Sequence, residues 1–222
     1  FLVMFGCCFV FLQGEDGIRD LVRSRGLGDV YKRQDLGDAS DDYTGCDTSL
    51  SLGYTYNADN NDAGFYGANP PAIGYDFFQG PIVPALATDS AKFLGNWKKG
   101  YRNLPMTAFT FYINSNGTYA DPDLGVAAGS VQFYNYLTGF LWDGDPFVDP
   151  NTGEAVDFVL SGDPVEGTGW NEVNGWPGSP TGGPGDRRHL MCSGPFNMAP
   201  GDTQEVVVGI VIARGTNNLN SI

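Results

Sequence analysis

Basic residues and histidine are scarce in this sequence. The 222 residues include 12 Lys and Arg, 26 Asp and Glu, and a single His, which gives a net charge of −14. Such an acidic chain lacks the basic face that nucleic-acid phosphates require, and attraction by charge to an anionic membrane is disfavoured for the same reason. The composition therefore predicts no nucleic-acid partner. An acidic surface suits solubility outside the cell and the binding of divalent cations.

Long apolar runs are also missing. The most apolar stretch, Phe1 to Leu12, has 12 residues, whereas a helix that spans a bilayer needs roughly 20. It has no basic segment before it and no small-residue cleavage site after it, so it does not match a secretion signal. The sequence predicts no membrane insertion.

Cysteine offers little chemistry. In residues 35–222 it occurs only as Cys46 and Cys192, and neither has the CxxC spacing of a zinc or redox site. Two interpretations remain open at this stage. The pair forms one long-range disulfide, as in an exported protein, or both are unpaired buried thiols.

Motifs of enzymes are sparse, and whether the chain is an enzyme stays open, with a non-catalytic role favoured. A Ser-His-Asp triad would have to use His189, and Ser193 near it lacks the GxSxG context of a nucleophile elbow. We expect a structural, partly exposed His189 and ion pairs for Arg187 and Arg188. The tryptophans Trp142, Trp170 and Trp176 suit a sugar-stacking surface or, more simply, core packing.

The N-terminal segment resembles translated sequencing-adapter read-through. Residues 13–20 (QGEDGIRD) and 24–34 (SRGLGDVYKRQ) each match the translation of a library adapter, in the expected order. The resemblance implies that residues 1–34 are non-native and poorly packed. It also implies that residues 35–222 are one module, truncated at one or both ends, of a longer metagenomic reading frame.

Residues 35–222 predict a mainly β fold, a sandwich with long Gly/Pro/Asp-rich loops and at most one or two short helices. Alternating or β-branched stretches predict strands at residues 50–56, 109–113, 155–160 and 203–213, and the last is apolar enough to be central in a sheet. Near-helical spacing of apolar residues predicts a helix at residues 130–142. Polar turns separate these elements.

Acidic clusters are the main candidates for a binding site. Five carboxylates fall within 13 residues and repel one another unless solvated, protonated or neutralised by a cation. These are Asp35, Asp38, Asp41, Asp42 and Asp47. A second set of short oxygen donors follows at Asn57, Asp59, Asn61 and Asp62. Such loops predict Ca²⁺, which takes six to eight oxygen ligands, or else they are solvated turns.

A third acidic segment has ligand spacing close to that of an EF-hand. Positions 1, 3, 7, 9 and 12 of the loop are Asp143, Asp145, Asp149, Asn151 and Glu154. The motif departs where it is strictest, because Val148 replaces the glycine of position 6 and two prolines interrupt the loop. The interpretations are a Ca²⁺ loop of another type or a plain turn-rich loop.

Several blocks together resemble an uncharacterised region of large secreted bacterial proteins that carry a C-terminal type IX sorting domain. The blocks are residues 35–42, 45–48, 54–57, 70–74, 161–164, 167–170, 186–188, 193–196 and 199–205. The resemblance implies an extracellular or cell-surface location and further domains of the same polypeptide. It supplies no catalytic residues.

Two functions are therefore weighed. The first is a non-catalytic surface module with Ca²⁺-stabilised loops that acts in adhesion or contacts carbohydrate or another surface polymer. The alternative is a fragment of a secreted hydrolase, either a peptidase or a glycosidase. A pocket that joins His189 or two facing carboxylates to the tryptophans would favour the hydrolase.

Overall fold

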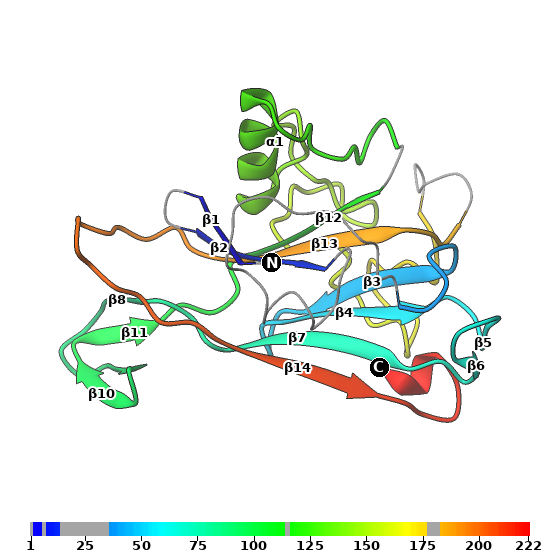
Figure 1. Ribbon diagram of the computed structural model, residues 1–222, viewed down its shortest axis with the longest axis horizontal. Coiled ribbons are helices and arrows are strands. Elements are labelled where there is room, and N and C mark those ends of the chain that lie inside the picture. The colour runs from blue at the N-terminus through cyan, green and yellow to red at the C-terminus, as the bar shows by residue number, and fades with distance from the viewer. Residues whose placement is uncertain (1, 6–7, 14–35, 114–115, 177–182) are drawn as a thin grey trace.

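Two four-stranded antiparallel sheets form the body of the protein (Figure 1). The computed structural model describes residues 2–5, 8–13, 36–113, 116–176 and 183–222. The first sheet has the order β1 (Leu2–Phe5), β2 (Cys8–Gln13), β13 (Arg187–Ser193), β12 (Ala108–Ile113). The second has the order β14 (Val207–Ala213), β7 (Ala72–Gln79), β4 (Leu52–Asn57), β3 (Asp42–Asp47). The expected mainly β fold is confirmed.

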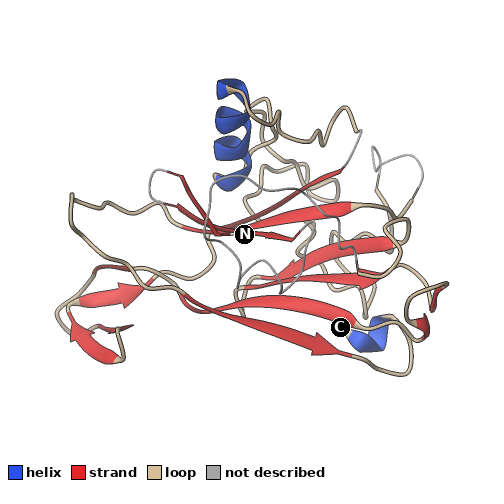
Figure 2. Ribbon diagram, viewed as in Figure 1, coloured by secondary structure: helices blue, strands red, loops and turns tan. Residues whose placement is uncertain are grey.

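Smaller elements surround the sheets (Figure 2). Three short antiparallel pairs join β5 (Asn61–Asp62) to β6 (Gly67–Ala68), β8 (Ile82–Pro84) to β11 (Tyr101–Asn103), and β9 (Ser90–Phe93) to β10 (Asn96–Lys99). The helices are α1 (Ala127–Leu137) and the 3-10 helix η1 (Leu219–Ser221). Among the described residues, no helix has the length and apolar character needed to cross a membrane.

The inner faces of the two sheets pack against each other. Phe109 and Met191 are cross-strand partners on β12 and β13, and both are fully buried. They lie over Gly53 of β4, where a Cβ atom would come within 2.8 Å of the Met191 Sδ and of the Phe109 ring. Alternation along the strands sends every second side chain to this layer. A glycine at this position therefore lets the sheets approach closely.

The opposite face of β12 and β13 is also covered, so these strands are buried on both faces. The Thr110 hydroxyl donates to the backbone oxygen of Tyr136 in α1 at 2.9 Å. Tyr136 and Phe147, from the helix and the loop after it, are buried against the same sheet. Figure 1 shows α1 standing on this sheet, on the side away from β3 and β4.

Several predicted elements need correction. Residues 155–160 form no strand, because they run through turns with only isolated bridges such as Phe109 to Phe158. The apolar strand expected to be central is β14, which lies at the edge of its sheet and exposes Val211 and Ile212. The predicted helix and the strands near residues 52 and 109 are confirmed with shifted bounds.

The sequence predicts few contacts between residues 1–34 and the rest of the chain, but strand β2 of this segment contacts the first sheet. Strand β2 pairs with β13 over five positions, from His189 with Gln13 to Ser193 with Phe9. The expectation of few contacts is therefore wrong for β2. The adapter-like residues after Gln13 lie outside the described residues.

The long-range disulfide does not form. Cys46 is a free buried thiol in the layer between the sheets. Cys192 is buried in a different hydrophobic cluster, which lies between β13 and α1. Successive residues of β13 point to opposite faces, and Cys192 lies on the face turned away from Cys46.

Candidate functional site

Two acidic segments meet at one end of the β3–β4 pair. The register places Asp42 opposite Asn57, so the loop before β3 runs beside the loop after β4. The backbone N–H of Ala58 donates to the backbone oxygen of Asp41 at 2.6 Å. Pairing of the strands therefore joins the two acidic sets that the sequence separates.

Asp62 organises this acidic loop cluster, which we define as Asp38, Asp41, Asn57, Asp59 and Asp62. Its side chain is fully buried, with one oxygen accepting from the Asp38 N–H at 3.2 Å and the other from the Tyr66 N–H at 3.3 Å. Gly37 packs against the Asp62 carboxylate with φ +87°, so any larger residue there would collide with it.

Asp41 and Asn57 are incompletely satisfied. Burial raises the pKa of Asp41 to about 6. The Asn57 amide lies close enough to lower this pKa in part, but without the geometry of a hydrogen bond, and Asp62, Asp38 and Asp59 raise it further through their negative charge. Asn57 is fully buried, yet neither its amide nitrogen nor its amide oxygen makes a hydrogen bond with the described residues. Buried polar groups are normally hydrogen-bonded, so this position suits an additional ligand.

Asp47, a predicted ligand of the first set, lies away from this cluster. Asp47 is five residues along β3 from Asp42, a separation of about 16 Å at 3.3 Å per residue. Its carboxylate accepts hydrogen bonds from Ser49 and Leu50 in the β3–β4 turn, which lower its pKa. Asp35 lies outside the described residues. Asp59 stays at the margin of the cluster, where it accepts from the Asn61 N–H.

The EF-hand-like loop is built from turns. Asp143 accepts from the Asp145 N–H at 3.1 Å, and Asp149 accepts from the Asn151 N–H at 2.8 Å. Glu154 is exposed, and its backbone pairs with that of Asp149. Within the described part of the chain, no three His, Cys, Asp or Glu side chains gather as a metal centre. Ca²⁺ sites in proteins also use amide oxygens, backbone oxygens and water, and therefore need fewer carboxylates than such a group contains.

His189 lies between the two sheets and is fully buried rather than partly exposed. Its Nδ1 is 3.0 Å from the Thr44 Oγ1, and its Nε2 makes no hydrogen bond with the described residues. Burial lowers its pKa to about 3. Ser193 donates to the backbone oxygen of Pro105 instead of approaching the imidazole. Neither residue has the geometry of a catalytic triad.

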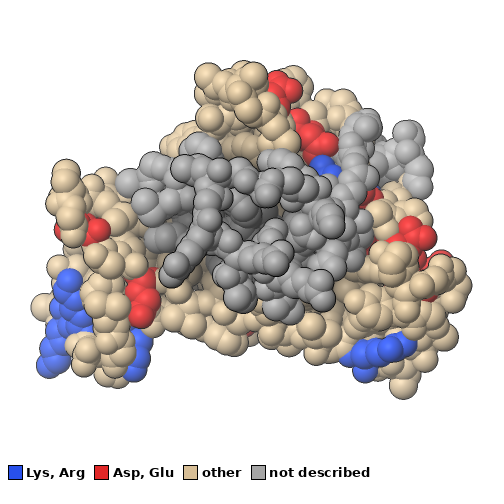
Figure 3. Space-filling view, viewed as in Figure 1, with Lys and Arg blue, Asp and Glu red and all other residues tan. Residues whose placement is uncertain are grey.

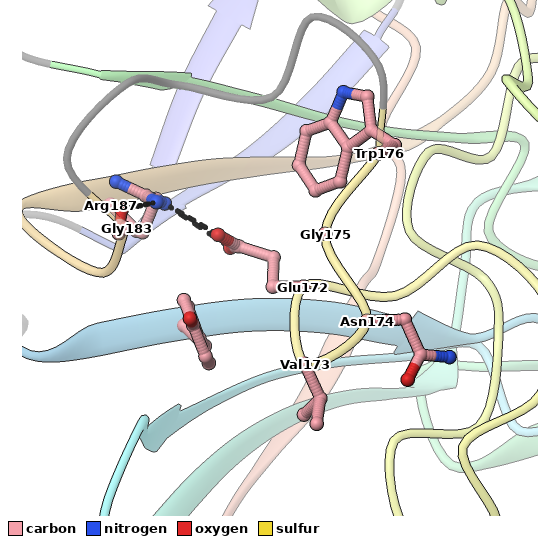
Figure 4. A pocket seen from close by; sticks show the side chains of 8 residues that line it. Glu172, Val173, Asn174, Gly175, Trp176, Gly183 and Arg187 are labelled. Carbon is pink, nitrogen blue, oxygen red and sulfur yellow. Dashed lines mark hydrogen bonds and ion pairs between the residues drawn. The ribbon is translucent and has the colours of Figure 1, made fainter.

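A pocket of about 220 Å³ lies beside a buried ion pair (Figure 4). The Arg187 Nε is 2.8 Å from the Glu172 Oε2, and both side chains are 2 % exposed. The other oxygen of Glu172 accepts from the Thr44 N–H at 2.9 Å. Arg188 pairs with Asp121 and Asp186, so the expected ion pairs of both arginines are confirmed.

The pocket does not supply paired acids. Burial raises the pKa of Glu172 to about 7, although Arg187 and the Thr44 N–H oppose the shift. Glu172 is the only carboxylate that lines the pocket among the described residues. Glycoside hydrolysis needs two carboxylates. This arrangement therefore ties the loop that carries Glu172 to the sheets.

Tryptophans divide differently from the expectation. Trp170 is buried, while Trp142 and Trp176 are half-buried and pack against the hydrophobic cluster beneath α1. The exposed one is Trp97 on β10, at 70 % exposure. Sequence reasoning missed it, although three lysines lie within five residues of it in a chain with few cations.

Comparisons with known proteins give no assignment. No family model, no curated protein and no solved structure matches the chain.

Proposed function

We propose that this protein is a non-catalytic surface module in which Ca²⁺ links the two acidic loops at the end of β3 and β4. Asp41 and Asp62 would supply carboxylate oxygens and Asn57 its amide oxygen, with backbone oxygens and water completing the shell. The ion would join loops that lie 16 or more residues apart in the sequence, at Asp41 and Asn57.

The observation that carries the proposal is Asn57. A fully buried amide without a hydrogen bond is costly, about 1–3 kcal/mol for each group left unsatisfied. It lies beside a carboxylate whose pKa is raised by burial and by three acidic neighbours. A hard divalent cation would satisfy the amide oxygen and neutralise the carboxylates at once.

A non-catalytic role agrees with the rest of the molecule. His189 is enclosed between sheets, and the described pocket offers one carboxylate that is already paired with Arg187. The similarity to regions of secreted proteins with a type IX sorting domain supports a place at the cell surface, next to other domains of the same polypeptide. Adhesion or contact with a surface polysaccharide fits such a module.

Calorimetric titration with CaCl₂ tests the proposal, using the wild type, Asp41→Asn and Asp149→Asn. We expect one site in the wild type and at least tenfold weaker binding in D41N, because the amide lacks the charge that attracts the ion. D149N is the matched control, since it makes the same change in the EF-hand-like loop. Binding lost in D149N and kept in D41N, or no binding by the wild type, would overturn the proposal.

A further inference from the structure

Free positive charge in the described structure is concentrated on one protruding unit. Of the basic residues after residue 35, Arg187 and Arg188 are in ion pairs, and Arg214 donates to backbone oxygens of Tyr66, Ala68 and Asn69. The remaining four are Lys92, Lys98, Lys99 and Arg102. They lie on β9, β10 and β11, at the end of the molecule where Figure 3 shows Lys and Arg gathered.

These four cations form no ion pair with the described residues. Asp89 and Glu205, acidic residues of the same region, already accept hydrogen bonds from the backbone N–H groups of Leu86 and Leu94 at 3.1 and 2.7 Å. Two of them, Lys92 and Lys98, instead lie next to aromatic rings. Lys98 Nζ is 3.8 Å from the centre of the Tyr101 ring. Their charge is thus left available to an outside anion.

An exposed indole lies among the cations. Trp97 is 70 % exposed and pairs across the hairpin with Lys92, whose Nζ lies 5.4 Å from the centre of the indole ring. Lys99, two residues along β10, shares the same face because side chains alternate along a strand. One face of the hairpin therefore presents the indole of Trp97 together with Lys92 and Lys99.

The unit that carries this face is held in place. The side-chain amide of Asn103 donates to the backbone oxygens of Gly80 and Lys92, and its oxygen accepts from the Lys92 N–H at 2.8 Å. Gln204 binds both backbone groups of Ile82. Ala91, on the other face of β9, is fully buried. A face fixed in this way loses little entropy when a ligand binds.

We propose that this hairpin patch, defined as Lys92, Trp97 and Lys99, binds an acidic polysaccharide, with Lys98 on the opposite face of β10. The C–H face of a sugar ring would stack on the Trp97 indole, and carboxylate or sulfate groups of neighbouring sugars would pair with the ammonium groups. The inference deepens the proposed surface role by naming its ligand class and a site separate from the Ca²⁺ loops.

Net charge does not oppose this ligand. Exposed charges farther away than about 8 Å are largely screened at physiological salt, so the acidic body acts weakly on a ligand at the tip of the unit. A nucleic acid is less well matched, because it carries a charge on every nucleotide and needs a longer basic track. A polymer with spaced anionic groups and apolar sugar faces fits an isolated indole between lysines.

Affinity electrophoresis of the full chain in Ca²⁺-containing buffer tests the proposal with dextran sulfate, carboxymethyl dextran and neutral dextran. These probes share one backbone and differ in charge. We expect both anionic polymers to retard the wild type, neutral dextran to leave it unretarded, and W97A and K92Q/K99Q each to weaken retardation at least fivefold. Phe65→Ala, at another residue of 70 % exposure, is the control for the ring.

A128E/V165E lowers the net charge by the same amount at exposed positions and is the control for charge. Equal losses in this double variant, or no retardation of the wild type, would overturn the proposal. Equally tight binding of single-stranded DNA or of phosphatidylserine vesicles through the same residues would assign the patch to another anion and also overturn it. Each variant must keep the Ca²⁺ response of the wild type. The failure of this site is therefore distinguishable from failure of the proposed Ca²⁺ role.

Discussion

Replacing His189 by leucine would isolate the acid sensitivity of the layer between the sheets. The Thr44 hydroxyl donates to the backbone oxygen of Tyr54 at 2.9 Å, so it accepts from the His189 Nδ1–H. The Nε2 lone pair then has no hydrogen-bond partner among the described residues. Protonation would bury a charge and an unsatisfied donor together, which explains why burial lowers the pKa of His189 to about 3.

The sign of the effect follows from this shift. Because the folded pKa lies below the unfolded value of 6.5, the unfolded state takes up the proton first as the pH falls. The histidine therefore removes stability below pH 6.5, down to the folded pKa. At about 1.4 kcal/mol per pH unit, the loss reaches about 3 kcal/mol at pH 4.5.

Urea unfolding followed by tryptophan fluorescence at pH 7.5 and pH 4.5 measures this loss. H189L should gain about 3 kcal/mol relative to the wild type between the two pH values, since it lacks the titrating group. Asp41 and Glu172 titrate in both proteins, so the comparison removes their effects. Thr110→Val, a buried change without a titrating group, should show the same difference from the wild type at both pH values. An H189L difference that is equally independent of pH would refute the reasoning.

Two further predictions concern the carboxylates. Glu172→Gln leaves the Arg187 charge buried without its ion-pair partner. The free energy of unfolding, measured in urea, should fall by about 3–5 kcal/mol. A loss below about 1 kcal/mol would contradict a buried pair. Calorimetric titration should show Ca²⁺ affinity about tenfold weaker at pH 5 than at pH 7. The reason is that Asp41 has a pKa raised to about 6 and must lose its proton to bind the ion. Equal affinities would argue against Asp41 as a ligand.

Local patterns predicted the elements that have a clear periodicity. Strands β4 and β12 and the helix α1 follow from alternating or helical spacing of apolar residues. Strand β3 was missed because its sequence, DYTGCD, is polar and its inward side chains Asp42 and Thr44 are buried by partners distant in sequence. The apolar β14 was misplaced at the sheet centre, since composition does not reveal how many neighbours a strand has.

The acidic loop cluster was predictable only in part. Sequence spacing identified both acidic sets, but the register of β3 with β4 decides that Asp41 and Asn57 come together while Asp47 lies at the far end. The EF-hand-like spacing was a weaker guide, because its carboxylates accept hydrogen bonds from the turns that they form. The cations of the hairpin patch can be read from the sequence. The net charge of the chain, however, does not reveal that they lie apart from most of the acidic residues.

The most direct test of the central claim is thermal unfolding of the full chain at pH 7.5 with CaCl₂ and with excess EGTA. A ligand that binds the folded state raises its stability by mass action. We predict a higher Tm in Ca²⁺ for the wild type and for D149N, and a much smaller shift for D41N. The same Tm for the wild type in Ca²⁺ and in EGTA would contradict a Ca²⁺ site in the acidic loop cluster.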